Sequence, residues 1–184
     1  MSKTKTEEWI KAGYELFSNE GIESLKVERL ARSLELNKSG FYHYFGSMNT
    51  YLKYLMEYHI NKAKDLTEEI AGCQNIDPDL LHLIIRHKSF FLIESQLLVK
   101  CRPAQFGEDI GIGKAASIVT LKLLPLWRKF TLLPDDSSTA TAYLNIILHF
   151  FYARINSDNI NYEFLHALTF ETQGVLKKVM KEKP

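Results

Sequence analysis

The sequence predicts an all-α protein in which three short helices precede a larger helical part. Apolar residues recur at helical spacing along most of the chain. The 184 residues include only 5 prolines and 9 glycines, and long stretches lack both of these helix-breaking residues. This length suits one domain, or a small module joined to a larger one. We place the boundary near Gly46, which gives an N-terminal domain of residues 1–46 and a second domain of residues 47–184.

The three N-terminal helices follow from apolar stripes and stop signals. The first is expected over about residues 6–19, and Gly21 follows it as a stop. The second, near residues 27–34, has apolar residues at i, i+3, i+4 and i+7. The third begins near Asn37 and ends at Gly46.

The rest of the chain is expected to form long helices. One opens at Ser47 or Asn49 and ends near Gly72. Asp77-Pro78 is typical of a helix start, a capping side chain followed by proline, and predicts a helix to about residue 100. Further helices are expected over 114–130, 137–155 and from about 160 to 181, with a loop over 102–113 and a kink at Pro125.

Composition excludes several classes of protein. The 23 Lys and Arg residues nearly balance the 22 Asp and Glu residues, so a strongly basic protein that coats nucleic acid is excluded. Two cysteines are too few for a disulfide framework. No apolar run is long enough to span a membrane, and the N-terminus has no apolar secretion signal. We therefore expect a cytoplasmic protein with no membrane partner.

Two short helices separated by a tight turn at Glu35-Leu36 predict a helix-turn-helix. In this motif the first helix crosses the phosphate backbone, and the second inserts its N-terminal residues into the major groove of DNA. The exposed N-terminus of a helix also offers unpaired N–H groups to phosphate. A domain without net positive charge could therefore still bind double-stranded DNA.

At these residues the chain resembles the TetR family of bacterial transcriptional regulators. The resemblance rests on GIESLKVERLAR at residues 21–32 and LNKSGFYHYFGS at residues 36–47, and it covers about residues 9–55. It implies a helix-turn-helix DNA-binding domain followed by a helical ligand-binding and dimerisation domain. It also implies a homodimeric repressor that binds an operator and leaves it when a small apolar or amphipathic effector binds.

The chain departs from the family pattern at several positions. Leu34 and Glu35 stand where a small residue and glycine are usual, and Gly40 stands where threonine is usual. Met48 replaces a lysine at the start of the long helix, and Leu25-Lys26 replaces a pair of threonines. These changes affect the expected affinity for DNA more than the fold.

Candidate DNA contacts follow from position and chemistry. The first turn of the recognition helix should face base edges, with lysine donating to guanine. Tyrosine, histidine and lysine side chains nearby should contact phosphates, which position the protein without specifying sequence. The candidates are Lys38, Ser39 and Gly40 for bases, Tyr42, His43, Lys26 and Lys53 for phosphates, and Asn37 as the helix cap. The alternative is that Tyr42 and Phe45 belong to the core.

The helix over 137–155 is apolar on two faces, so one face can pack within the subunit while the other requires a partner. Together with the last helix it predicts a two-fold symmetric four-helix interface. The candidate interface residues are Ile146, His149, Phe150, Ala153, Phe164, Leu168 and Leu176. The alternative is a helix enclosed within a monomer.

A small-molecule pocket is expected between the long helices, because such sites are mostly apolar with a few polar groups. The candidate lining residues are Tyr58, Phe90, Phe91, Glu94, Leu97, Cys101, Leu121 and Trp127. Each of them could equally be ordinary core. Glu94 is notable because a carboxylate among Phe90, Phe91 and Leu97 requires a partner, unless it faces water.

No enzyme signature is present. Gly111-Ile-Gly113-Lys114 lacks the first glycine of a phosphate-binding loop, and Ala115 replaces the hydroxyl that would hold magnesium. His82 and His87 point in different directions on a helix, so we expect no metal site and no cofactor. The leading hypothesis is a ligand-responsive DNA-binding repressor. The second is a related helical sensor or interaction module that has lost tight DNA binding, and an enzyme built from distant residues is third.

Overall fold

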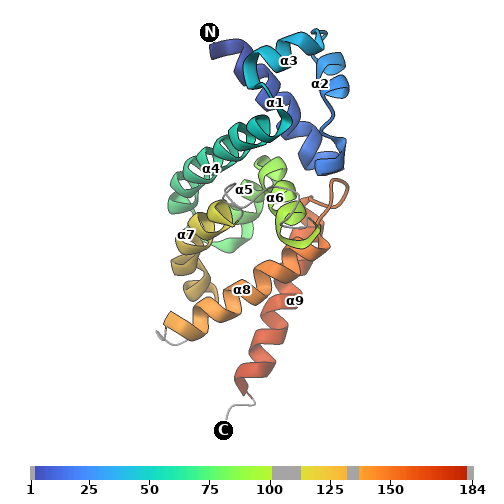
Figure 1. Ribbon diagram of the computed structural model, residues 1–184. Coiled ribbons are helices and arrows are strands. Elements are labelled where there is room, and N and C mark those ends of the chain that lie inside the picture. Colours follow the sequence, from blue (N-terminus) through green and yellow to red (C-terminus); the bar gives the residue numbers. More distant parts are fainter. Residues whose placement is uncertain (1–2, 101–112, 132–136, 182–184) are drawn as a thin grey trace.

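The computed structural model describes residues 3–100, 113–131 and 137–181, and within these ranges it is helical with no strand (Figure 1). The first helices are α1 (Lys3–Glu20), the 3₁₀ turn η1 (Ile22–Ser24), α2 (Val27–Ser33), α3 (Lys38–Phe45) and α4 (Met48–Gly72). They are followed by the π-helical turn η2 (Ile76–Leu80), α5 (Leu81–Arg86), α6 (Lys88–Ser95), the π-helical turn η3 (Gln96–Lys100), α7 (Lys114–Thr131), α8 (Ser137–Arg154) and α9 (Tyr162–Lys181). The predicted all-α fold is confirmed.

The ends of α3 and α4 have clear local causes. Gly46 ends α3 with a left-handed φ of 68°, which glycine adopts without steric cost, and its N–H donates to the carbonyl oxygen of Tyr42 at 2.9 Å. Ser47 then caps α4, because its Oγ accepts from the N–H of Thr50 at 3.2 Å. The start of α4 is therefore fixed directly behind α3.

The predicted helix from Asp77 to residue 100 is wrong in two respects. Asp77 has extended backbone angles (φ −110°, ψ 123°), and its carboxylate accepts from the Tyr162 hydroxyl at 2.8 Å and contacts His166 of α9 instead of capping a helix. The helix is also interrupted at His87 (φ −103°, ψ 29°), which separates α5 from α6. No glycine or proline marks this break, so the sequence pattern could not reveal it.

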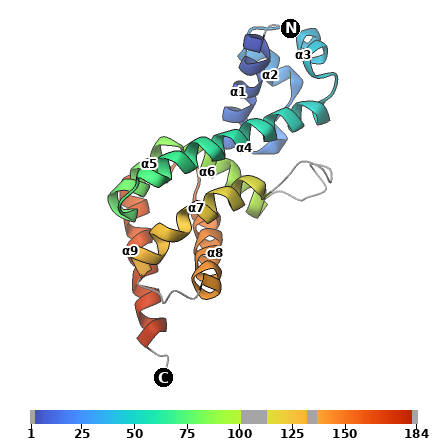
Figure 2. The same cartoon turned by 90° about the vertical axis from the view of Figure 1, so that its left-hand side faces the viewer.

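Two groups of helices meet along α4. We call α1, α2 and α3 the head, and α5 to α9 the body. Figures 1 and 2 show α4 running from the head along the body, where α7 packs against it. Helix α7 continues through Pro125. The predicted loop over 102–112 and the predicted break near Pro134 lie outside the described residues.

Each group has its own apolar core, and α4 and α6 contribute to both. The first half of α4, from Tyr51 to Met56, packs in the head core, whereas Ala63, Leu66 and Ile70 pack in the body core. On α6, Phe90, Phe91 and Leu92 face the body core, while Ile93, followed by Leu97 in η3, joins the head core. These two elements therefore connect the head to the body through packed side chains.

Candidate functional site

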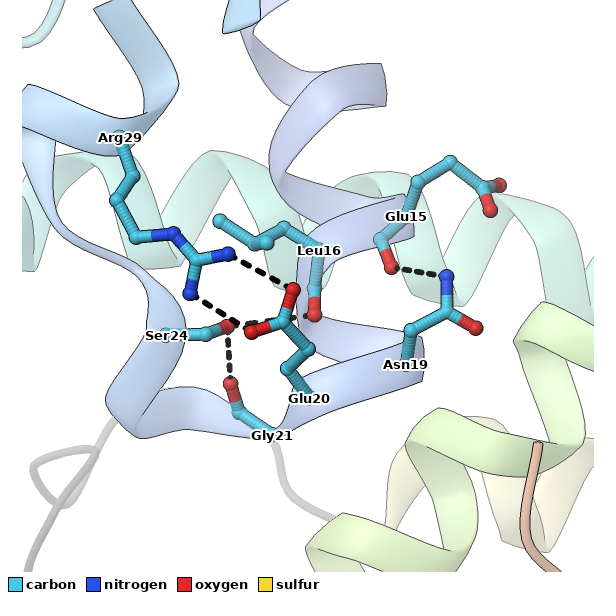
Figure 3. A network of polar contacts seen from close by, with 7 residues as sticks. All are labelled: Glu15, Leu16, Asn19, Glu20, Gly21, Ser24 and Arg29. Carbon is cyan, nitrogen blue, oxygen red and sulfur yellow. Dashed lines mark hydrogen bonds and ion pairs between the residues drawn. The ribbon is translucent and has the colours of Figure 1, made fainter. Parts of the chain in front are cut away.

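Polar contacts fix the corner between α1 and α2 (Figure 3). Arg29 donates to both carboxylate oxygens of Glu20, at 2.7 and 2.8 Å, and this hydrogen bonding lowers the pKa of the Glu20 carboxyl. The Ser24 hydroxyl donates to the carbonyl oxygen of Gly21 at 2.6 Å. These contacts link the end of α1 to α2 and close the turn η1 between them.

The turn between α2 and α3 has an unusual backbone. Glu35 is left-handed with a φ of 55°, the position where the TetR pattern has glycine. The N–H of Leu36 donates to the carbonyl oxygen of Ala31 at 2.9 Å, which closes the turn. A non-glycine residue in this conformation costs about 1 kcal/mol or more, so the rest of the head holds the turn against its local preference.

Helix α3 has one buried side and one exposed side. Phe41 is fully buried, with its ring edge-to-face with that of Trp9 at a centroid distance of 5.5 Å. Phe45 packs edge-to-face against Tyr51 at 4.9 Å. On the opposite side, 55% of Tyr42 is exposed to solvent. Of the two residues for which a core role was the alternative, Phe45 is core and Tyr42 is not.

The residues predicted to contact DNA lie on the head surface and on the adjoining part of α4. The exposed ones are Lys26, Asn37, Lys38, Ser39, Tyr42, His43 and Lys53, and Gly40 is half-buried. Asn37 precedes α3 in an extended conformation, but its side chain makes no capping hydrogen bond, which corrects the expected capping role. A Cβ added at Gly40 would lie 3.9 Å from Trp9 Cζ2, an ordinary contact, so core packing does not require glycine there.

The ammonium of Lys38 has a partner within the head. Its Nζ lies 2.7 Å from Glu28 Oε1 on α2, and both side chains are more than half exposed. Hydrogen bonding from Lys38 lowers the pKa of the Glu28 carboxyl, which stays ionised. Because both side chains of this pair are exposed to water, which screens their attraction, Lys38 can exchange Glu28 for another acceptor at small cost.

A buried chain of hydrogen bonds joins the head to the body. The hydroxyl of Tyr14 on α1 lies 2.9 Å from Nδ1 of His59 on α4, and Nε2 of His59 lies 2.8 Å from Oε1 of Glu94 on α6. All three side chains are at most 4% exposed. The prediction that Glu94 requires a partner is confirmed, and that partner comes from a helix 35 residues away in the sequence.

Burial constrains the protonation of these hydrogen-bonded side chains. Burial, with Tyr58 and Glu94 nearby, holds the pKa of Tyr14 well above its ordinary value, so its hydroxyl stays protonated. That hydroxyl can donate to Nδ1 of His59 while the Nε2–H donates to Glu94. The second carboxylate oxygen of Glu94 is buried without a hydrogen-bond partner among the described residues, so the polar chain is not fully satisfied.

A polar pocket lies beside this chain, where α1, α4 and the start of α6 meet. It encloses about 430 Å³, including its opening to solvent, and Tyr58 and Phe90 of the predicted effector set line it. Lys62 and Glu15, which carry opposite charges, face the same space. Arg86 also lines the pocket, and its guanidinium is paired with Glu69 at 3.0 Å. We assign no ligand to this pocket.

A second pocket in the body is almost entirely apolar. It encloses about 790 Å³, including its opening to solvent. Phe91 and Trp127 of the predicted effector set line it, and most other walls come from α5, α7, α8 and α9. Those walls include Leu81, Ile84, Leu123, Phe130, Leu144, Ile147, Leu148, Phe151, Leu165, Leu168, Thr169 and Thr172, and Leu80 of η2 adds to them.

The remaining predicted effector residues lie elsewhere. Leu121 is 72% exposed on the outside of α7, so it lines neither pocket. Leu97 belongs to the head core, and Glu94 is occupied by His59. Cys101 lies outside the described residues. The prediction placed these side chains by helical spacing alone, which does not show the helix each one faces.

The predicted dimer residues divide between surface and core. Ile146 and Phe150 of α8 are 62% and 48% exposed, and His149 and Ala153 are exposed beside them. Phe164 is half-buried under the guanidinium of Arg154. Leu168 is a correction, because it is buried in the body core and lines the apolar pocket. The side chain of Leu176 lies outside the described residues.

Two exposed apolar residues of α9 were missed by the sequence analysis. Phe170 and Val175 are 73% and 58% exposed. In Figures 1 and 2 the C-terminal half of α9 extends past the other helices. The apolar stripe that was read from the sequence is the side of α9 that packs on α5, and Phe170 and Val175 lie outside it. A separate count of apolar residues outside that stripe could have found them.

The described helices include none that is long and apolar enough to cross a bilayer. Within the same residues no group of three or more His, Cys, Asp or Glu side chains is arranged to hold a metal ion.

Comparison with known proteins agrees with this architecture. Residues 10–54 match the model of the bacterial regulatory proteins of the tetR family. A transcriptional regulator (TerR/AcrR family) from Aquifex aeolicus VF5 is similar in structure, with a TM-score of 0.58, 21% identity, and 95% of this chain and 98% of that chain covered. A TetR/AcrR regulator from Thermobifida fusca YX-ER1 gives a TM-score of 0.57 at 18% identity, with 95% and 97% covered. No curated protein matches the sequence.

The family match covers α3 and most of the head, and the structural likeness extends over nearly the whole chain. The chain therefore shares the fold of the TetR/AcrR regulators, and its residues 10–54 match the tetR family of bacterial regulatory proteins.

Proposed function

We propose that the protein is a homodimeric repressor that leaves its operator when a small apolar or amphipathic effector binds the body. The observation that carries this proposal is the exposed side of α3, where Lys38, Ser39, Tyr42 and His43 are free of the core. Behind them, Phe41 anchors the helix in the head. A rigid helix with an exposed polar side suits insertion into the major groove.

Roles in DNA contact follow from this placement. Lys38, Ser39 and Gly40, in the first turn of α3, would face base edges. Tyr42 and His43 follow on the same helix and would contact phosphates. Lys26 at the start of α2 and Lys53 on α4 would add positive charge on either side of α3. The side chain of Asn37, which makes no capping hydrogen bond, would be available to DNA.

Glu28 is expected to weaken binding. Its carboxylate holds Lys38 at 2.7 Å and places a negative charge close to the proposed DNA surface. Replacing Glu28 with glutamine would release Lys38 and remove that charge. We expect Glu28→Gln to raise DNA affinity severalfold, with the larger gain at low salt because the effect is electrostatic.

The dimer proposal is supported by the exposed apolar residues of α8 and α9. Ile146 and Phe150 on α8 and Phe170 and Val175 on α9 are each about half exposed or more, which is unusual for large apolar side chains. Joining two copies through these helices would hold two α3 helices apart. Regulators of this kind require about 34 Å between recognition helices to reach successive major grooves.

Release by an effector would act through α6. Phe91 lines the apolar pocket, whereas the neighbouring Ile93 packs in the head core and Glu94 bonds to His59. A ligand that favours a different position of α6 would shift the head relative to the body. The size of the response is limited by the difference in the ligand's affinity for the two arrangements.

The test is binding to DNA upstream of the protein's own gene, measured by fluorescence anisotropy at several salt concentrations. We expect affinity to fall steeply as salt rises. Lys53→Met should reduce the salt slope by about 1, and Tyr42→Phe should weaken binding without changing that slope. Lys38→Met should relax preference at one base pair. Lys122→Met, which removes an exposed charge on α7, is the matched control and should change nothing.

Absence of binding at every salt concentration would contradict the proposal and favour the second hypothesis, a helical sensor without DNA binding. One observation favours that alternative: Lys38, the lysine proposed to contact a base, is already paired with Glu28.

The dimer is tested separately by sedimentation. Ile146→Asp and Phe170→Asp should convert a dimer to a monomer, because each would bury a charge at the interface. Leu121→Asp changes a leucine of α7 that is 72% exposed, and it should leave the dimer intact. A wild-type protein that sediments as a monomer at micromolar concentration would contradict this part of the proposal.

A further inference from the structure

The ion pair of Lys38 and Glu28 places a hydrogen-bond donor and an acceptor next to each other on the surface of the head. Lys38 is the first residue of α3, and Glu28 lies in the first turn of α2, which packs against α3 (Figure 1). Lys38 Nζ is 2.7 Å from Glu28 Oε1, and more than half of each side chain is exposed. A molecule that contacts the ammonium therefore also meets the carboxylate.

The two groups have opposite and fixed hydrogen-bonding roles. Hydrogen bonding from Lys38, with a contribution from the backbone of Glu28 itself, lowers the pKa of the Glu28 carboxyl, so this group is ionised at neutral pH and can only accept. The ammonium of Lys38 can only donate. The pair is therefore complementary to a partner that presents an acceptor beside a donor, in that order.

Base pairs present such groups in a defined order in the major groove. In a G·C pair the guanine O6 acceptor lies beside the cytosine N4 donor, and a hydrogen bond of about 2.9 Å joins them. This spacing is close to the 2.7 Å between Lys38 Nζ and Glu28 Oε1. A C·G or A·T pair reverses the order, so the ammonium would face a donor and the carboxylate an acceptor. A T·A pair keeps the order but has a methyl group where guanine has its second acceptor, N7.

We propose that Lys38 and Glu28 together recognise one G·C base pair at each recognition helix, with Lys38 donating to guanine O6 and N7 and Glu28 accepting from cytosine N4. This proposal rests on the proposed function, because it takes α3 as the helix that enters the major groove. It gives Glu28 a role in specificity. The carboxylate lowers affinity for DNA in general, and the loss is smallest at a base pair that offers it a donor, so other sequences are penalised.

The first test selects duplexes from a pool of random sequence with the full-length protein and then measures binding to single-site variants by fluorescence anisotropy. We expect G·C in one orientation at one base pair of each half-site, and a change to A·T or C·G there should weaken binding about tenfold or more. Lys38→Met and Glu28→Gln should each reduce this ratio by at least about threefold at that same base pair. Glu28→Gln should strengthen binding most at the A·T and C·G duplexes, because glutamine can donate as well as accept.

Exchanging the two charges is a more direct test, because it keeps an ion pair between α2 and α3. In a protein that carries both Glu28→Lys and Lys38→Glu, the donor and the acceptor change places. Preference at this base pair should shift from G·C to C·G, while the rest of the selected sequence stays the same. Glu20 and Arg29 form the matched control, an exposed pair at 2.7 Å between α1 and α2. Exchanging those two residues should leave the preferred base pair unchanged.

Two results would overturn the proposal while the proposed DNA binding stands. In the first, Lys38→Met relaxes a preference that neither Glu28→Gln nor the charge exchange alters, so Lys38 acts alone. In the second, the base pair whose preference depends on Lys38 is not G·C in the wild-type protein, a measurement that does not depend on the folding of any variant. If the wild-type protein binds no duplex from the pool at any salt concentration, the proposed function itself is wrong, and recognition by this pair is wrong with it.

Discussion

The head core and the body core differ in how completely side chains fill the space between helices. In the head, Trp9, Phe17, Phe41 and Tyr51 have no solvent exposure, and neither described pocket penetrates between them. In the body, the residues around Trp127 line an apolar pocket of about 790 Å³, a volume that includes its opening to solvent. Close packing fixes one arrangement of side chains, whereas a partly empty core can accept a ligand.

This contrast matches two different requirements. A helix that is proposed to enter a DNA groove must be held in one orientation, and the ring contacts of Phe41 and Phe45 leave α3 little freedom. A pocket that receives an effector must tolerate an empty state and a filled state. The comparison can be tested by substitutions in each core, in the contacts between them, and in the turn of the head.

The largest effect is expected at Gly13 in the head. A Cβ added there would lie 1.6 Å from the hydroxyl oxygen of Tyr51, which also donates to the carbonyl oxygen of Trp9 at 2.9 Å. Gly13→Ala must displace the ring and break that bond, so the free energy of unfolding should fall by about 3 kcal/mol or more. Chemical denaturation followed by circular dichroism measures it.

A matched control and a rescue accompany this change. Gly72, the last residue of α4, has no atom within 4 Å of an added Cβ, so Gly72→Ala should alter stability by less than about 0.5 kcal/mol. Tyr51→Phe removes the oxygen nearest to the new Cβ, so Gly13→Ala should cost less in that background. If Gly13→Ala alone lowered the free energy of unfolding only slightly, the head core could adjust to an added methyl group. The proposed contrast between a rigid head core and an adaptable body core would then be wrong.

Truncating one leucine in each core compares the two directly. Leu30 of the head is fully buried, while Leu144 of the body is 3% exposed and lines the apolar pocket. Leu30→Ala should cost about 3–4 kcal/mol and Leu144→Ala about 2 kcal/mol, because Leu144 already has empty space on one side and loses fewer contacts. Equal losses in denaturant titrations would remove the distinction between the cores.

A smaller effect is expected in the polar chain between the two regions. Tyr14→Phe leaves Nδ1 of His59 without its partner and should lower the free energy of unfolding by about 1–2 kcal/mol. Combined with Glu94→Gln, the two changes should be non-additive by at least about 0.5 kcal/mol, because both bond to His59. Tyr54→Phe, at a tyrosine that is 42% exposed, is the control. If the two losses in stability were strictly additive, the hydrogen-bonded residues Tyr14, His59 and Glu94 would not act as a unit.

The smallest effect is a gain at Glu35. Glu35→Gly relieves the left-handed strain at φ 55° but increases the freedom of the unfolded chain, so stability should rise by only about 0.5–1 kcal/mol. Glu35→Ala keeps the Cβ and therefore the strain, and it should give no comparable gain. A Glu35→Gly protein that is less stable than the wild type in thermal melts would contradict the strain assigned to this turn.

Local features were predictable from the sequence. The limits of α2, α3 and α4 follow from nearby glycines, a capping serine and apolar spacing, all of which act within a few residues. The buried and exposed sides of α8 were also predicted by periodicity, since Leu144 and Tyr152 are buried and Ile146 is exposed.

Features that depend on distant parts of the chain were not predictable. The break at His87 has no local marker, and Asp77 bonds to Tyr162 rather than capping a helix. Glu94 was expected to require a partner, but spacing could not identify His59 or Tyr14. The pocket walls from α8 were missed for the same reason, because periodicity shows which side is buried but not which helix it meets.

The sharing of α4 and α6 between two cores has a consequence for recombination. A chimaera that grafts only residues 1–46 onto a relative would separate Trp9 from Tyr51 and Phe17 from its neighbours on α4 and α6. The grafted head would then pack against side chains of the other protein over the part of its core that α4 and α6 supply. New combinations of head and body should therefore arise by gradual change along α4 and α6 more readily than by exchange of whole segments.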